Sequence, residues 1–149
     1  MAIVELTKKQ VIEAIRKEPR LRYCRWVGVL RPSGGTSSLL AERQDKPPPA
    51  RKCTFCAVGA VVRAAMATTT PVTLIAEAAA DGGGDDASPL SALSEAFEGA
   101  CSETMLDVTA ADAEAGRKAA IDHVRKNFPA RVRIDIGAAK PRRGMKVVG

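Results

Sequence analysis

The chain has 149 residues, with 46% hydrophobic, 27% charged and 3% aromatic residues and a net charge of +6, values that fit one globular domain. No stretch approaches the roughly 20 apolar residues that span a bilayer, and the N-terminus contains no apolar signal-peptide region. We therefore expect a cytoplasmic protein without a membrane partner. Abundant alanine and scarce aromatics favour close-packed helices.

The first predicted element is a helix that begins with the capping box Thr7-Lys8-Lys9-Gln10. This helix runs to about Lys17, because Pro19 prevents its continuation. The side chains expected to face the core are Val11, Ile12 and Ile15. After it, residues 23–30 predict a strand, and residues 31–52, rich in proline and glycine, predict a long mobile loop.

The next segment is Cys53–Arg63. From Cys56 to Ala67 the chain is apolar on nearly all sides of a helix. A helix with this pattern is buried rather than amphipathic. Gly59 in its interior costs roughly 1 kcal/mol relative to alanine. We therefore predict that another backbone packs closely against Gly59 and that this helix is the centre of the domain.

Two further helices are predicted by a capping residue followed by proline at the first helical position. Thr70-Pro71 begins a helix to about residue 80, and Ser88-Pro89 begins one to about residue 99. The acidic, glycine-rich residues 81–87 between them predict a flexible linker. The side chains of the second helix expected to be buried are Leu90, Leu93 and Phe97.

The last helix begins at about Thr109 and is ended by Pro129. Its expected buried side chains are Ala113, Ala120, Ile121, Val124 and Phe128. Residues 131–136 alternate between polar and apolar side chains and predict a strand, with residues 23–30 as its partner. Residues 137–149 predict a basic, disordered tail.

These elements predict one mainly α (α+β) domain over residues 1–136. Four to five helices surround the buried central helix, and a minor two-stranded β element covers one side.

Charge is segregated along the chain. Residues 1–60 contain 12 Lys/Arg and 5 Asp/Glu, residues 61–109 contain 1 and 8, and residues 110–149 contain 10 and 4. Such segregation can steer an acidic partner onto a basic face, or the segments can neutralise one another within the fold. The candidate residues for binding a host protein or nucleic acid are Arg16, Arg20, Arg22, Arg131, Arg133, Arg142 and Arg143.

The cysteines and the single histidine are the candidates for chemistry. Cys56, in the first turn of the buried helix, is a candidate nucleophile with His123 as its base, and the alternative is a small buried apolar residue. Cys53 and Cys56 form a CxxC motif, which needs further ligands from Cys24, Cys101 and His123 to complete a zinc site. No other catalytic, metal or phosphate-binding motif is present, so we expect no cofactor and favour a protein that is not an enzyme.

Four motifs carry a resemblance to a known group: Trp26-Val27-Gly28, Cys56-Ala57-Val58-Gly59-Ala60-Val61, Leu93-Ser94-Glu95-Ala96-Phe97-Glu98 and Asn127-Phe128-Pro129. Across residues 7–136 the chain resembles a group of small uncharacterised proteins of phages and other mobile elements. The hallmarks of that group are a Trp-x-Gly segment and a Cys-Ala-[Leu/Val]-Gly-Ala helix. The resemblance implies an accessory protein that binds a macromolecule in the host cytoplasm.

The expected function is therefore that of a small non-enzymatic binding or accessory protein that engages a host protein or nucleic acid through a charged face. Two alternatives stay open. One is a cysteine-dependent enzyme that uses Cys56 and His123. The other is a nucleic-acid-binding protein that uses the basic N-terminal and C-terminal thirds.

Overall fold

A computed structural model describes residues 2–24, 26–30, 36–38, 48–67, 72–83, 89–101 and 110–148. Over these ranges the α-helices are α1 (Lys8–Lys17), α2 (Ala57–Ala65), α3 (Val72–Gly83), α4 (Pro89–Ala100) and α5 (Ala110–Asn127). The strands are β1 (Ala2–Thr7), β2 (Val27–Leu30), β3 (Thr36–Ser38), β4 (Cys53–Phe55), β5 (Arg131–Gly137) and β6 (Lys146–Val147). A short 3-10 helix, η1 (Ala50–Lys52), precedes β4. None of the described helices is both long and apolar enough to cross a membrane.

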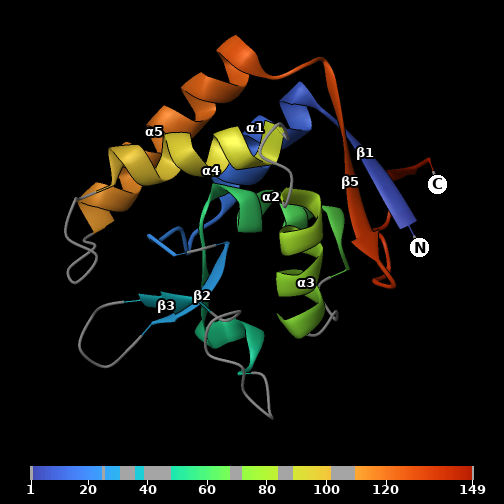
Figure 1. Cartoon of the computed structure of the whole chain (residues 1–149), viewed down its shortest axis with the longest axis horizontal. Helices are drawn as coiled ribbons and strands as arrows, with labels where there is room; N and C mark the ends of the chain where they lie inside the picture. Colours follow the sequence, from blue (N-terminus) through green and yellow to red (C-terminus); the bar gives the residue numbers. More distant parts are fainter. Residues whose placement is uncertain are drawn as a thin grey trace.

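The strands form two antiparallel sheets of three strands each, in the orders β5-β1-β6 and β3-β2-β4. Figure 1 shows β1 and β5 beside the two chain termini, and β2 and β3 on the other side of α2. The prediction of a minor two-stranded β element is therefore wrong. The protein is an α+β domain in which two separate sheets pack against the helices.

The predicted pairing of residues 131–136 with residues 23–30 is also wrong. β5 pairs with β1, whereas β2 pairs with β3 and β4. The pairing with β1 places apolar side chains of both strands on one buried face: Val4, Leu6, Val132, Ile134 and Ile136. The sequence did not predict β1, because this strand continues into α1 without a loop. Thr7 is both the last residue of β1 and the N-cap of the helix.

The segment after residue 136, expected to be a disordered tail, is ordered as far as Val148. β6 pairs with β1, and the Val148 N–H donates to the Ile3 carbonyl oxygen at 2.8 Å. Ala139 is buried, and Pro141 forms an isolated β-bridge with Met66 after α2. The free edge of β1 and the end of α2 supply backbone partners that a sequence pattern does not reveal.

Two further predictions fall partly outside the described residues. Of the predicted linker 81–87, residues 81–83 belong to α3, and residues 84–87 are not described. Of the predicted loop 31–52, residues 36–38 form β3 and residues 50–52 form η1. Residues 31–35 and 39–47 of that loop are not described.

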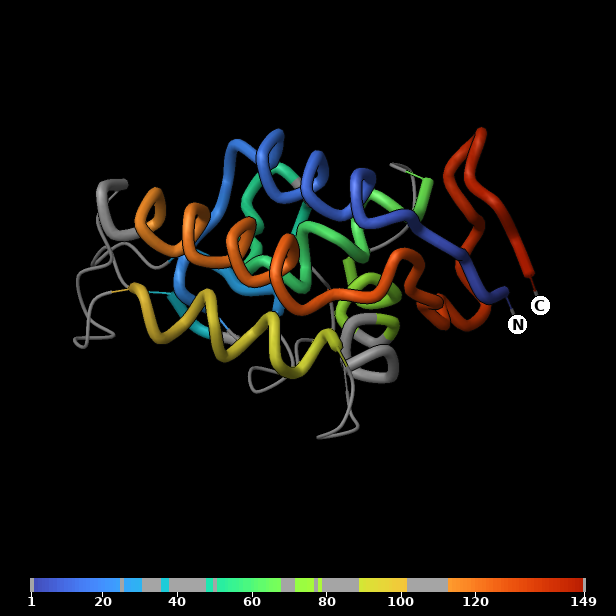
Figure 2. Tube along the Cα trace, turned by 90° about the horizontal axis from the view of Figure 1, so that it is seen from above, coloured from blue at the N-terminus to red at the C-terminus, as the bar shows by residue number. Residues whose placement is uncertain are grey.

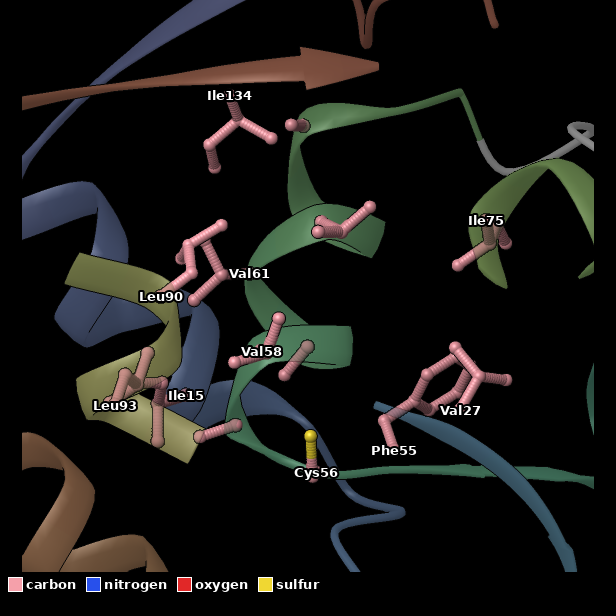
Figure 3. Packing of buried hydrophobic residues seen from close by; sticks show 14 of the residues in the cluster. Ile15, Val27, Phe55, Cys56, Val58, Val61, Ile75, Leu90, Leu93 and Ile134 are labelled. Carbon is pink, nitrogen blue, oxygen red and sulfur yellow. The ribbon is translucent and has the colours of Figure 1, made fainter. Parts of the chain in front are cut away.

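The central position of α2 is confirmed. Seven of its nine residues are buried, and Figure 3 shows Val58 and Val61 directed towards side chains from the surrounding elements. The labelled side chains around them come from α1, α3, α4 and β5: Ile15, Ile75, Leu90, Leu93 and Ile134. The apolar pattern therefore identified the core of the domain correctly.

The predicted backbone contact at Gly59 is confirmed as well. A Cβ atom at this position would lie 1.9 Å from the carbonyl oxygen of Trp26. The same oxygen accepts the Cys56 N–H at 3.1 Å, just before α2 begins. Trp26 has a φ of 68°, the only positive φ of a non-glycine residue in the described ranges. The Trp-x-Gly and Cys-Ala-Val-Gly-Ala motifs therefore meet in one close backbone junction.

The N-terminal helix forms as its capping box predicts. The Gln10 N–H donates to the Thr7 hydroxyl at 3.2 Å, and the Thr7 N–H donates to the Gln10 side-chain oxygen at 2.8 Å. Val11 and Ile15 are buried. α1 packs against α2 and α5, so its remaining faces are available to carry charge.

Candidate nucleic-acid interface

The outer face of the β5-β1-β6 sheet is strongly basic. Alternate residues of a strand point to opposite faces, and Val132 and Ile134 are buried, so Arg131 and Arg133 point outward. Their side chains are 62% and 71% exposed, and Lys146 on β6 is 62% exposed. Three extended cations therefore stand on one rigid surface.

A single carboxylate organises these three cations. Glu5 lies on the central strand, directly opposite both Arg133 and Lys146 in the strand register, and its side chain is only 9% exposed. Its carboxylate oxygens lie 3.3 Å from Arg131 NH1, 3.6 Å from Arg133 Nε and 3.3 Å from Lys146 Nζ. We call these four residues the basic sheet face.

The carboxylate of Glu5 stays charged at neutral pH. Desolvation by burial opposes ionisation, but Lys146, Arg131 and Arg133 outweigh it and hold the pKa of Glu5 below its usual value. Three positive charges and one negative charge give these four residues a net charge of +2, and Asp135, the next residue of β5 on the same face, reduces the net charge of that face to +1. Because each cation contacts a common anchor, the array is partly ordered before any ligand arrives.

A second basic surface lies between α1 and α5. A shallow hollow of about 470 Å³ there is lined by Arg16, Lys118, Ala119, Ile121, Asp122 and Arg125. Asp122 is paired with Lys126 at 2.9 Å, and Arg16 is paired with Glu13. Within the described ranges, Lys118 and Arg125 have no ion-pair partner. We call Arg16, Lys118 and Arg125 the basic helix groove.

The segments that carry the two basic surfaces adjoin at the start of α1. The Lys8 backbone N–H donates to the Ala130 carbonyl oxygen at 3.0 Å, and the Lys8 Nζ donates to the Arg125 carbonyl oxygen at 3.1 Å. Thr7, the preceding residue, pairs with Arg131 on β5. In Figure 2, α1 and the C-terminal half of α5 run side by side towards the sheet. The segments that carry the groove and the sheet face are thus neighbours, and we call the two surfaces together the basic region.

The structure brings together only some of the predicted binding residues. Arg131 and Arg133 share the basic sheet face, and Arg16 lines the basic helix groove. Arg20 lies elsewhere, with its guanidinium carbon 5.8 Å from the centre of the Phe55 ring. Arg22 donates from NH1 to the Leu21 carbonyl oxygen at 2.7 Å. Arg20 and Arg22 thus belong to the segment that packs on β4, outside both basic surfaces.

The adjacent residues Arg142 and Arg143 differ in role. Arg142 Nε donates to the Met66 carbonyl oxygen at 3.2 Å, and its NH2 donates to the Arg63 carbonyl oxygen at 3.3 Å. These carbonyls lie at the C-terminal end of α2, where the Arg63 oxygen also accepts the Met66 N–H at 3.3 Å. Arg143 is exposed. Arg142 is therefore a capping residue of α2, and Arg143 is a surface cation.

Sequence reasoning missed Glu5, Lys118, Arg125 and Lys146 as members of the basic region. Lys118 and Arg125 are seven residues apart, which places both on one face of a helix. That spacing was a usable signal for the groove. The grouping of Glu5 with Lys146 had no local signal, because it depends on pairing between the two ends of the chain.

The candidate nucleophile Cys56 is fully buried, and burial raises the pKa of its thiol to about 12. The nearby N–H groups of Gly59 and Val58 at the start of α2 lower this pKa only partly. The thiol is therefore protonated at neutral pH. His123 lies on α5 beside Asn127 and Phe128, and no hydrogen bond joins it to Cys56.

All four cysteines are buried free thiols. In the CxxC motif, the Cys53 thiol donates to the Pro49 carbonyl oxygen at 3.8 Å, whereas Cys56 occupies the N-cap position of α2 without a side-chain capping hydrogen bond. Among the described residues, no three His, Cys, Asp or Glu side chains are grouped so that they could hold a metal ion. The burial of Cys56 matches the interpretation as a small apolar core residue.

A second hollow of about 300 Å³ lies between α1, α2 and the turn before β6. At its edge, Arg63 NH1 lies 2.5 Å from Glu18 Oε2, and the Glu18 side chain is 4% exposed. The lining carries both signs of charge: Glu13, Lys17, Glu18, Arg63 and Arg142. Since these charges are largely matched among themselves, this hollow selects for anions less clearly than the basic region does.

Comparisons of the chain with known protein families, with curated protein sequences and with solved structures find no match in any of the three.

Proposed function

We propose that this protein is a non-enzymatic binding protein that engages the phosphate backbone of a nucleic acid. The observation that carries the proposal is the basic sheet face, where Arg131, Arg133 and Lys146 are exposed around the single carboxylate of Glu5. The basic helix groove extends this positive surface around the start of α1.

The chemistry of these side chains suits phosphate. Arginine guanidinium groups present several N–H donors in a planar fork that matches phosphate oxygens, and lysine adds a compact point charge. Charges on a rigid surface also raise the local concentration of a polyanion and speed its association. A patch of this kind binds through charge and not through base sequence.

The cysteine-dependent enzyme is disfavoured as an alternative. A nucleophilic cysteine needs its thiolate form and access to a substrate. Cys56 is fully buried with a pKa of about 12, so it meets neither requirement at neutral pH. We therefore place the function on the charged surface and not on the central helix.

The context of this activity is also a proposal. On its sequence motifs, we infer that the chain belongs to the group of small phage and mobile-element proteins and acts in the host cytoplasm. A protein that binds a nucleic-acid backbone fits an accessory role in that setting. An acidic host protein is the alternative partner for the same surface.

The test is direct binding to labelled nucleic acid, followed by fluorescence anisotropy. We expect wild-type protein to bind a mixed-sequence DNA tightly at about 50 mM salt, to weaken to a Kd of about 10⁻⁴–10⁻⁶ M near physiological salt, as sequence-independent contacts do, and to release the DNA as salt rises further. Lys118→Gln/Arg125→Gln should weaken binding several-fold.

The matched control is Arg51→Gln/Lys52→Gln, which removes two exposed cations of η1 outside the basic region. It should bind as tightly as wild type. Absence of binding at low salt, to DNA and to RNA alike, would remove the proposal. Equal weakening by both double variants would show that the net charge of the protein, and not the position of the cations in the basic helix groove, sets the affinity for DNA.

A further inference from the structure

The arrangement of cations on the basic sheet face also bears on the kind of nucleic acid bound. We infer that the ligand is a double-stranded rather than a single-stranded nucleic acid. This inference rests on the proposed function and deepens it.

The three cations form a two-dimensional array. Arg131 and Arg133 are two residues apart on β5, which separates their Cα atoms by about 7 Å. Arg133 and Lys146 both pair with Glu5 on the strand between them, so they lie in one row across the sheet, about 9.5 Å apart. The Cα atoms therefore spread both along the strands and across them, whereas the charged groups converge on the Glu5 carboxylate.

A duplex matches such an array better than a single strand does. A single strand offers one line of phosphates, whereas a duplex offers two lines on either side of a groove and a charge every ~1.7 Å along its axis. Because the three charged groups gather around Glu5, they form one compact cluster. A duplex places more phosphate charge within reach of such a cluster than a single strand does, because its charges are twice as dense along the axis.

The array is also partly ordered before binding. Glu5 contacts all three cations from the central strand, and its side chain is 9% exposed. A partly ordered array favours a rigid ligand, because less conformational freedom is then lost on association. A flexible single strand would have to be ordered to fit it.

Aromatic side chains lie elsewhere in the molecule. The chain has five of them, and Phe55, Phe97 and Phe128 are buried in the core. Tyr23 and Trp26 are partly buried in the segment before β2, in neither α1, α5 nor the strands of the basic sheet face. Proteins that bind single strands stack bases on aromatic rings. The basic region instead offers charge alone, which is the contact a stacked duplex accepts.

The experiment compares a mixed-sequence DNA duplex of about 20 base pairs with each of its separated strands, chosen without self-complementarity, at one salt concentration. Fluorescence anisotropy gives the three dissociation constants. We expect the duplex to bind at least tenfold tighter than either strand. In Arg131→Gln/Arg133→Gln this preference should fall to a few-fold, whereas Arg51→Gln/Lys52→Gln should retain it.

The outcomes separate this inference from the proposed function. Equal or tighter binding of the single strands would overturn the preference for a duplex while leaving nucleic-acid binding in place. Binding to none of the three at low salt would overturn both. A duplex preference that survives unchanged in Arg131→Gln/Arg133→Gln would show that the sheet array is not its source. Circular dichroism of each variant establishes that it is folded before its binding is compared.

Discussion

At the scale of single residues, Gly59 has the most sharply defined role. The Trp26 carbonyl group packs directly against Gly59 in α2 and leaves no room for a side chain there. The backbone of Trp26 in turn accepts the N–H of Cys56, so one carbonyl oxygen fixes both the start of α2 and its distance from the segment before β2. This explains why a costly helical glycine sits in an otherwise apolar helix.

Gly59→Ala tests this role. The new Cβ would lie 1.9 Å from a backbone oxygen, so α2 or the Trp26 segment must shift. We expect the free energy of unfolding to fall by about 1–3 kcal/mol, as for other overpacked cores, although alanine is the better helix former. Urea denaturation measures the change.

The control is Gly99→Ala in α4, where a Cβ would meet no atom within 4 Å. Here the stability should be unchanged or rise by up to about 1 kcal/mol. Equal effects of the two substitutions would contradict the close contact at Gly59.

Glu5 gives a second prediction at this scale, with a defined dependence on pH. Its folded-state pKa is held below its usual value of 4.5 by the three cations. The stabilisation that its charge provides is therefore present above that value and is lost as pH falls through the lower, folded-state pKa.

We expect wild type to be more stable than Glu5→Gln near neutral pH, and the difference to shrink as the pH falls below about 4. Chemical denaturation of both proteins across this range measures the difference at each pH. A difference that stays constant from neutral to acidic pH would show that the charge of Glu5 does not hold the array.

At the scale of elements, the ordered C-terminal segment changes how α2 is understood. The last carbonyls of a helix lack partners within it. Those of α2 receive the Arg142 N–H, bound to the Ala65 oxygen at 2.9 Å, and the guanidinium of the same residue. The segment after β5 therefore closes the end of the central helix and then adds β6 to the sheet.

Arg142→Ala should lower the free energy of unfolding by about 1–3 kcal/mol, because charge-assisted bonds to two carbonyl oxygens are lost. Arg143→Ala, the neighbouring substitution with the same change of charge, should alter stability by no more than about 0.5 kcal/mol. Thermal or urea denaturation compares them. If Arg143→Ala were the more harmful of the two, the capping role assigned to Arg142 would be incorrect.

The elements that sequence could predict were those with local signals. The capping box at Thr7, the apolar run of α2 and the alternation of residues 131–136 each specify a structure within a few neighbouring residues. Leu90, Leu93 and Phe97 are buried as their helical spacing predicted. These patterns depend on periodicity and capping, which act over one or two turns.

The sheets could not be predicted, because strand partners are set by contacts distant in sequence. β1 has only six residues and pairs with residues about 130 positions away. β4 has three residues and is buried throughout, so it shows no alternation. For the candidate site, Arg131 and Arg133 could be named from the sequence as candidates, but their grouping around Glu5 needed the strand register.

At the scale of the whole molecule, only some of the basic residues that are grouped in the sequence gather on one surface of the fold. Of the seven predicted arginines, Arg16, Arg131 and Arg133 lie in the basic region, and Arg142 serves the fold. Glu5, near the N-terminus, gathers Arg131, Arg133 and Lys146 from the C-terminal part of the chain, since β1 pairs with β5 and β6. The positive surface is thus a product of the fold rather than of any one segment.

The salt dependence of duplex binding tests this account most directly. The slope of log K against log salt should become less steep by roughly 1.8 in Arg131→Gln/Arg133→Gln, since each phosphate contact contributes about 0.9. In Arg51→Gln/Lys52→Gln, which removes the same charge from η1, the slope should match that of wild type. The same slope in all three proteins, or an equal reduction in both variants, would contradict a nucleic-acid interface on the basic sheet face.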